Sequence, residues 1–125
     1  MLKNFKDMKG VIAIATTPFD NENLIDFDSV DRLSNYYLES EVSGVTILGV
    51  MGEAHKLNIE EQKLLIKRYI NKLSGKVPVI VGVSNAGLDN LELLSKFSMD
   101  SGASGVMVSG NNGLKNDDQI KFYFN

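Results

Sequence analysis

Four short apolar segments recur along the chain, and this repeat constrains the fold more than any other feature. They cover residues 11–17, 45–48, 77–83 and 106–108 and are rich in valine, isoleucine and small residues. Each is apolar on both faces of an extended chain, which is typical of a buried strand. Their starts, near residues 11, 45, 77 and 106, are 34, 32 and 29 residues apart, which is enough for one strand and its crossover helix.

Amphipathic segments fill the intervals between these strands. Asp28 and Ser29 are expected to cap the first helix and Asn58 or a neighbour the second, while residues 88–101 and 117–124 form the third and fourth. Strands that alternate with helices form a parallel sheet with right-handed crossovers. We therefore predict an α/β fold with four parallel strands in sequential order, each followed by a helix on the outer surface.

A short internal sequence repeat supports this alternation of strands and helices. Residues 43–49 and 104–110 share serine, glycine, valine and a final glycine at equal spacing, and both stretches follow a predicted helix. The glycine before each strand, Gly44 or Gly105, suits the left-handed C-cap of the preceding helix.

Charge and cysteine content exclude several classes of protein. Charged residues make up 23% of the chain, the net charge is -3 and no basic stripe is present, so we expect no nucleic-acid partner. The absence of cysteine excludes disulfides, thiolate zinc sites and a cysteine nucleophile, and fits a reducing cytoplasm. We expect no signal peptide, because residues 1–9 are polar and lysine-bearing and no apolar stretch of about 7–15 residues follows them. We expect no membrane contact, because no apolar run approaches the ~20 residues of a membrane span.

Residues directly after the strands form the candidate site, because ligands of parallel α/β folds bind at the carboxyl ends of the strands. These stretches are residues 16–19, 49–53, 83–86 and 109–112. The most distinctive is 49–53, in which Gly49 and Gly52 are three residues apart. Successive N–H groups of such a loop can converge on a carboxylate or phosphate. A tight structural turn is the alternative interpretation.

Further motifs stand in a characteristic order around this loop. They are Ala15-Thr16-Thr17-Pro18-Phe19, Ile25-Asp26-Phe27-Asp28, Gly49-Val50-Met51-Gly52-Glu53, Leu57-Asn58-Ile59-Glu60-Glu61, Pro78-Val79-Ile80-Val81-Gly82-Val83-Ser84-Asn85 and Ser101-Gly102-Ala103-Ser104-Gly105-Val106. In these motifs the chain resembles the dihydrodipicolinate synthase/N-acetylneuraminate lyase family of pyruvate-dependent class I aldolases, from about Gly10 onward.

The resemblance implies a TIM (β/α)₈ barrel, a lysine that forms an imine (Schiff base) with pyruvate or another 2-oxo acid, and a Gly-x-x-Gly-Glu loop that holds the carboxylate. A complete barrel needs about 250 residues, and this chain has 125. We therefore expect residues 1–125 to be a single unit, the N-terminal half of such a barrel with its first four βα units. The family's imine lysine and its partner tyrosine are expected beyond Asn125.

Several positions depart from the family pattern. Val50 and Met51 stand where the family has threonine or serine, and Gly110-Asn111-Asn112 stands where many members have Pro-Tyr-Tyr. An imine-forming lysine needs a desolvated position that lowers its pKa. The lysines here fall in predicted helices and loops or before the first strand: Lys3, Lys6, Lys9, Lys56, Lys63, Lys67, Lys72, Lys76, Lys96, Lys115 and Lys121.

These observations give the following site assignment. Val50, Met51 and Gly52 are assigned to substrate binding, and Gly49 and Glu53 to the structure of the loop, with the Glu53 carboxylate accepting backbone N–H groups. His55 is interpreted as a loop residue, because one histidine and one carboxylate are too few ligands for a metal site. Asn111-Asn112-Gly113 is interpreted as a turn, with a polar ligand contact as the alternative. No catalytic residue, metal or cofactor is assigned.

Two functional hypotheses remain open. The first is a lyase-family protein that acts on a 2-oxo acid and is inactive by itself without the imine lysine. The second is a non-catalytic half-barrel that binds a small carboxylate or associates with itself. The first and fourth strands have no charge or proline to protect an exposed edge, so we expect a homo-oligomer or pairing with a complementary half-barrel.

Overall fold

The four predicted strands form one parallel sheet in the order β1-β2-β3-β4. This computed structural model describes residues 7–110 and 113–125. The strands are β1 Ile12–Ile14, β2 Gly44–Ile47, β3 Val79–Gly82 and β4 Gly105–Met107. The predicted direction, order and alternation with helices are confirmed.

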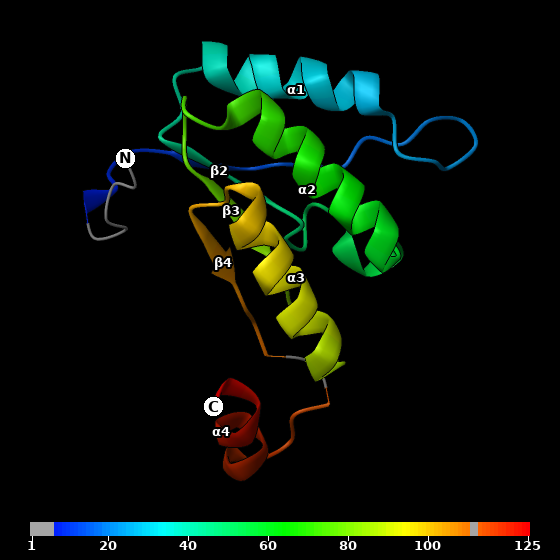
Figure 1. The fold of residues 1–125 in the computed structure, drawn as a ribbon, viewed down its shortest axis with the longest axis vertical. Helices are drawn as coiled ribbons and strands as arrows, with labels where there is room; N and C mark the ends of the chain where they lie inside the picture. The colour runs from blue at the N-terminus through cyan, green and yellow to red at the C-terminus, as the bar shows by residue number, and fades with distance from the viewer. Residues whose placement is uncertain (1–6, 111–112) are drawn as a thin grey trace.

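Three of the helices cover one face of the sheet (Figure 1). The helical elements are α1 Phe27–Glu39, the short 3₁₀ helix η2 Ala54–Lys56, α2 Ile59–Leu73, α3 Leu88–Ser101 and α4 Asp117–Phe124. Sequential parallel strands joined by crossovers of one hand place every connecting helix on the same side. Helices α1, α2 and α3 therefore form one layer, and the sheet forms the other.

The caps of the first two helices are built from local hydrogen bonds. Asn58 and Glu61 form a reciprocal capping box at the start of α2, so the predicted Asn58 cap is confirmed. The predicted Asp28 cap of α1 is wrong by two residues. Asp26 is the N-cap, because its carboxylate accepts hydrogen bonds from the N–H and the hydroxyl of Ser29, and these bonds lower the pKa of Asp26.

The predicted glycine C-caps are also displaced. Gly44 and Gly105 lie inside strands β2 and β4, where they pair with Ile12 and Ile80. The left-handed residue after α3 is Gly102, with φ 110°, and Glu41 takes this conformation after α1, with φ 54°. Each chain reversal thus comes three residues earlier than predicted, because the repeated glycines, Gly44 and Gly105, already belong to the sheet.

The main core lies between the sheet and α2. Val45, Ile47 and Val81 are fully buried on the helix-facing side of the strands, as are Leu65 and Ile66 of α2. Burying one such side chain contributes about 1.5–3 kcal/mol. The buried pairs of β2 and β3 therefore hold the centre of the sheet against the helix layer.

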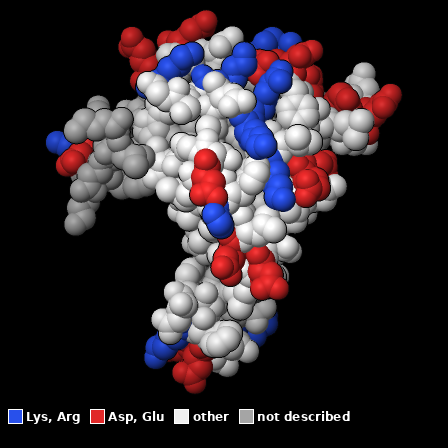
Figure 2. Space-filling view, viewed as in Figure 1, with Lys and Arg blue, Asp and Glu red and all other residues white. Residues whose placement is uncertain are grey.

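The outer surface of the helix layer is charged (Figure 2). Arg68 of α2 donates two hydrogen bonds of 2.7 Å to the Asp31 carboxylate of α1, which hold the pKa of Asp31 below its usual value. Lys63 and Lys67 lie 5.6 and 5.5 Å from the centre of the Phe97 ring on α3. These contacts link the three helices and mark their outer side as the hydrated face of the protein.

Helix α4 differs from the prediction in its position. It is separated from the layer formed by α1, α2 and α3 (Figure 1), and the Tyr123 hydroxyl donates a 3.2 Å hydrogen bond to the carbonyl of Asn85. Phe122 is 75% exposed and Phe124 52%. The predicted placement on the outer surface fails because no described strand lies beneath the apolar side of this helix.

Strand β2 ends in a strained bend at Leu48. This buried residue has φ 55°, a left-handed conformation that is uncommon for bulky residues. The bend directs the Leu48 carbonyl at Gly82 of β3, where an added Cβ atom would lie only 2.3 Å from the carbonyl oxygen. Gly82 therefore has no room for a side chain, and the bend depends on this glycine.

The two faces of α2 predict opposite effects for neighbouring leucines. Leu65 is fully buried, whereas Leu64 is 56% exposed. Leu65→Ala is expected to lower the free energy of unfolding by ~3 kcal/mol, because it leaves a cavity in the core. Leu64→Ala should change it by less than ~0.5 kcal/mol. Urea denaturation followed by circular dichroism measures both, and equal losses would contradict the assigned orientation of α2.

The close approach at Gly82 predicts a similar contrast between glycines. Gly82→Ala is expected to lower the free energy of unfolding by ~3 kcal/mol, because a backbone carbonyl occupies the space of the new methyl group. Gly49→Ala is the matched control, since its Cβ would meet no atom closer than 3.8 Å; its effect should stay within ~1 kcal/mol. Denaturant melts of the two variants would test this, and a tolerated alanine at position 82 would refute it.

Candidate functional site

The loop at residues 49–53 consists of two overlapping tight turns. The Gly52 N–H donates to the Gly49 carbonyl at 3.1 Å, and the Glu53 N–H donates to the Val50 carbonyl at 3.0 Å. The Gly52 amide is thus used inside the loop. For the Met51 amide the structure gives no hydrogen-bond partner within residues 7–110 and 113–125. The side chains of Val50 and Met51 are 84% and 60% exposed.

Contacts with the end of β1 hold this loop in place. The Thr17 hydroxyl donates a buried 2.6 Å hydrogen bond to the Gly52 carbonyl. A Cβ at Gly52 would lie 3.1 Å from the Leu48 nitrogen and 3.3 Å from the Ala15 carbonyl oxygen. The second glycine of the motif is therefore required by close packing, in addition to any role of its backbone.

Two tyrosines support the same segment from the helix layer. The Tyr69 hydroxyl donates a 3.0 Å hydrogen bond to the Thr16 carbonyl. Burial raises the pKa of Tyr69 far above its usual value, and it also raises the pKa of Tyr37, which is hydrogen-bonded to Thr16 as well. Both phenols stay protonated near neutral pH. Sequence reasoning missed this role; the available signal was two tyrosines on the apolar faces of helices, whose hydroxyls need partners when buried.

The carboxyl ends of all four strands meet around the loop. A Cβ built on Gly49 would touch Met107 of β4 and Ile14 of β1 at 3.8 and 4.0 Å. After β3 and β4, the Ser109 N–H donates to the Ser84 hydroxyl oxygen at 2.8 Å, and the two hydroxyl oxygens are 3.0 Å apart. Both serines belong to stretches predicted to share this edge. Their pairing was not predictable, since it depends on the register of β3 and β4.

The acidic and imidazole groups beside the loop face solvent. Glu53 takes a left-handed conformation with φ 54°, and its carboxylate pairs with Lys56, whereas the sequence suggested backbone N–H partners. His55 is exposed. Among the described residues no three His, Cys, Asp or Glu side chains form a group that could hold a metal ion. The predicted turn at Asn111 and Asn112 lies outside the described residues.

No lysine among the described residues lies on a strand or is buried. Lys63, Lys67 and Lys72 are on α2, and Lys96 is on α3. The Asp100 carboxylate raises the pKa of Lys96, which is the opposite of what an imine-forming amine requires. Lys3 and Lys6 lie outside the described residues.

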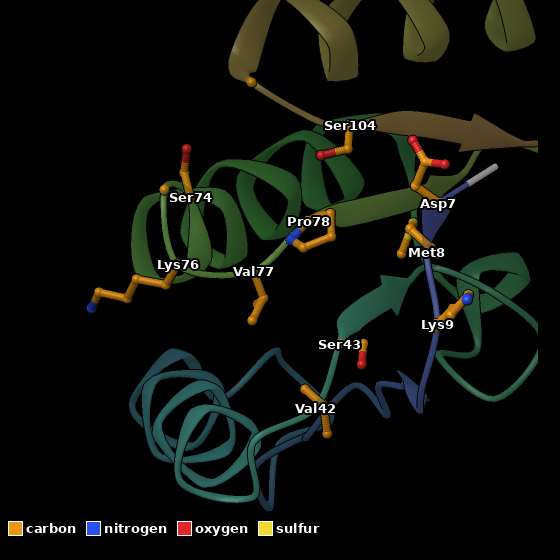
Figure 3. A pocket seen from close by; sticks show the side chains of 12 residues that line it. Asp7, Met8, Lys9, Val42, Ser43, Ser74, Lys76, Val77, Pro78 and Ser104 are labelled. Atoms are coloured by element: carbon orange, nitrogen blue, oxygen red, sulfur yellow. The ribbon is translucent and has the colours of Figure 1, made fainter. Parts of the chain in front are cut away.

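A separate open cavity of about 780 Å³ lies at the amino ends of the strands (Figure 3). Its lining includes Lys9, Ser43, Pro78 and Ser104, which precede β1, β2, β3 and β4. Ligands of parallel α/β folds bind at the opposite ends of the strands. The loop at 49–53 therefore remains the candidate site.

In the described part of the chain, no helix has the length and apolar character needed to cross a membrane.

Comparison with known proteins gives a consistent result. A model of the Dihydrodipicolinate synthetase family matches residues 7–110. A 4-hydroxy-tetrahydrodipicolinate synthase from Kosmotoga olearia is 38% identical over 101 residues, which cover 80% of this chain and 34% of that protein. The chain thus spans about a third of the length of the curated relatives it matches.

Solved structures agree with the fold. The dihydrodipicolinate synthase of Rhodopseudomonas palustris is 42% identical, with a TM-score of 0.90 over 99% of this chain and 41% of that chain. YagE from Escherichia coli K12, solved in complex with pyruvate, is 26% identical, with a TM-score of 0.86 over 92% of this chain and 39% of that chain. The parallel half-barrel, its motifs and these matches have one explanation: the chain belongs to the dihydrodipicolinate synthetase family.

Proposed function

We infer that this chain supplies the carboxylate-binding loop of a lyase that acts on pyruvate or a related 2-oxo acid. Membership of the family supports the reaction class, and the pyruvate complex of YagE supports the substrate class. The observation that carries the proposal is the exposed loop at 49–53, which the Leu48 bend and the Thr17 hydrogen bond fix where the four strand ends meet.

The proposed contacts are made by the backbone. Val50, Met51 and Gly52 form the middle of the loop, and the amide of Met51 is the donor available to an anion, since the Gly52 amide already bonds Gly49. Gly49 and Glu53 set the two turns on either side. A carboxylate would accept a charge-assisted hydrogen bond there, about twice as strong as a neutral one.

The chemical step is not assigned to these residues. No described lysine is buried or lies on a strand, so none has the desolvated position that imine formation requires. A second candidate function, carboxylate binding without catalysis, is favoured by the apolar side chains of Val50 and Met51. The cytoplasmic location expected from the sequence stays a prediction.

Imine formation gives a direct test of this division. The 125-residue chain, treated with pyruvate and sodium borohydride, is expected to show no added mass, because no described lysine is buried in the desolvated position that an imine-forming amine needs. Intact mass spectrometry would measure this, with borohydride alone as the control. A stoichiometric adduct on one lysine would contradict the proposal and identify a desolvated amine.

Pyruvate titration followed by amide NMR tests the binding loop. The largest shift is expected at the Met51 amide, with a smaller one at Gly52 because its N–H is already bonded. Loss of a hydrogen bond to a charged group costs about 1.5–3 kcal/mol, so a loop without its hydroxyls should bind with a Kd of ~1 mM or weaker. Shifts confined to residues 84–87 would contradict the assignment.

Restoring the hydroxyls should strengthen the same site. The double variant Val50→Thr with Met51→Thr is expected to lower the Kd for pyruvate ~10-fold or more, since each hydroxyl can donate to the carboxylate. The matched control, Met51→Val, has the shape of threonine without its hydroxyl and should leave the Kd unchanged. Methyl pyruvate lacks the carboxylate. In the same titration it should therefore show no binding to the parent chain, to the double variant or to the control variant.

A further inference from the structure

We propose that the paired hydroxyls of Ser84 and Ser109 form a second subsite, which binds a hydroxyl group on the tail of a 2-oxo acid longer than pyruvate. This inference rests on the proposed function, since the loop at 49–53 is taken to hold the carboxylate of the same ligand. The two serines follow β3 and β4, which are neighbours in the sheet (Figure 1).

The register of β3 and β4 places both serines on one side of the sheet. Gly82 pairs with Met107, and each serine comes two residues further along its strand. Side chains alternate between the two faces of an extended chain, so Ser84 lies on the side of Gly82, and Ser109 on the side of Met107. The intervening Val83 is buried in the core instead.

This is also the side on which the carboxylate-binding loop begins. A Cβ on Gly82 would lie 3.2 Å from the Gly49 nitrogen, and a Cβ on Gly49 would lie 3.8 Å from the Met107 side chain. The serines come two residues later, which is about 7 Å along an extended strand. The hydroxyl pair and the loop therefore belong to the same end of the sheet, where ligands of parallel α/β folds bind.

The Ser84 hydroxyl is held by the backbone of the neighbouring strand. Its oxygen accepts the Ser109 N–H at 2.8 Å, one step beyond the bond in which the Val83 N–H donates to the Met107 carbonyl. A side-chain oxygen thus continues the hydrogen bonding at the end of the backbone pairing. The two hydroxyl oxygens are 3.0 Å apart, so the side chains point toward each other.

The hydrogen bonds of the pair leave one O–H donor for a ligand. A serine hydroxyl has one O–H donor and two acceptor lone pairs. Whichever serine donates across the 3.0 Å contact, the O–H of the other has no partner within residues 7–110 and 113–125. Lone pairs also remain on the pair. A donor and an acceptor side by side match a ligand hydroxyl group, which needs both.

The surrounding strands favour an uncharged ligand group at this position. None of the four described strands carries a charged side chain, so the strands supply no cation for a phosphate or a second carboxylate. Pyruvate has no oxygen beyond its keto group. The pair therefore points to a 2-oxo acid whose tail extends past the keto carbon and ends in a hydroxyl group.

Two ligands of equal length test this assignment. In 4-hydroxy-2-oxobutanoate a terminal hydroxyl replaces the terminal methyl group of 2-oxopentanoate. In amide NMR titrations of the 125-residue chain, the hydroxylated acid is expected to bind ~5-fold more tightly, which corresponds to one neutral hydrogen bond. It should also shift the Ser84 and Ser109 amides more than 2-oxopentanoate does.

The same titrations distinguish failure of the subsite from failure of the carboxylate site. If both acids shift the Met51 amide with equal Kd, the carboxylate site stands and the hydroxyl subsite is refuted. If neither acid shifts the Met51 amide, the carboxylate assignment is wrong, and the ligand assigned to the serine pair is wrong with it.

Removal of both hydroxyls separates ligand binding from structure. The double variant Ser84→Ala with Ser109→Ala is expected to reduce the ~5-fold preference to less than ~2-fold, by weakening the hydroxylated acid and leaving the Kd of 2-oxopentanoate unchanged. An equal loss for both acids would indicate a structural role and overturn the proposal, as would an unchanged preference.

A serine at the opposite end of the same strand provides the matched control. Ser104 immediately precedes β4 and lines the cavity at the amino ends of the strands. Ser104→Ala removes the same hydroxyl group from the other end, so it should keep the ~5-fold preference for the hydroxylated acid. Loss of the preference in this variant would show that the discrimination does not arise at Ser84 and Ser109.

Discussion

The approach of the Leu48 carbonyl to Gly82 is the contact on which the candidate site depends. Strand β2 is buried along its whole length, and its continuation has to turn away before it meets β3. A left-handed buried leucine costs of order 1–3 kcal/mol, and it persists because the surrounding core over-determines its position. The missing side chain at Gly82 provides the space. The direction of the 49–53 loop follows from this one bend, and Thr17 then fixes its far side.

The sheet is stabilised unevenly across its two faces. On the helix side, Val45, Ile47 and Val81 are fully buried, and hydrogen bonds from Tyr69 and Thr17 attach the strand ends to their surroundings. On the other side, Ile14 and Met107 remain substantially exposed. Apolar surface left in water forgoes ~25 cal/mol per Å² of possible stabilisation, so this face contributes less to the stability of the described sheet than the helix-covered face does.

Sequence patterns predicted the regular part of the fold well, for a physical reason. Runs such as residues 45–48 and the periodic apolar positions of α2 report burial directly, and the alternation of such strands and helices determines strand order and helix side. The position of α4 was not predictable in this way, because an amphipathic pattern such as 117–124 states that a helix has an apolar side without stating what covers it. The cap at Asp26 was missed because two aspartates compete within three residues.

The site was predictable in outline but not in its hydrogen bonds. Paired glycines after a buried strand indicated a turn or an anion-binding loop, and the structure has the turn. Which amide remains available depends on the i to i+3 bonds of that turn, which consume the Gly52 N–H and leave that of Met51. Likewise, the partner of the Glu53 carboxylate is set by the left-handed backbone at that residue, a feature that residue type alone does not indicate.

Backbone and side chains make separate contributions to such a site, and the surroundings control both. Glycines and the Leu48 bend fix the backbone of the loop whatever side chains it carries, so an anion-binding geometry survives valine and methionine at its centre. Its strength depends on solvent, because a hydrogen bond to a carboxylate on an exposed amide competes with water, whereas the same bond is stronger where the local dielectric is low. Covering the face of the sheet that carries Ile14 and Met107 would remove water from the strand ends. By thermodynamic linkage, a partner that covers the sheet and strengthens carboxylate binding must itself bind more tightly when the carboxylate is present.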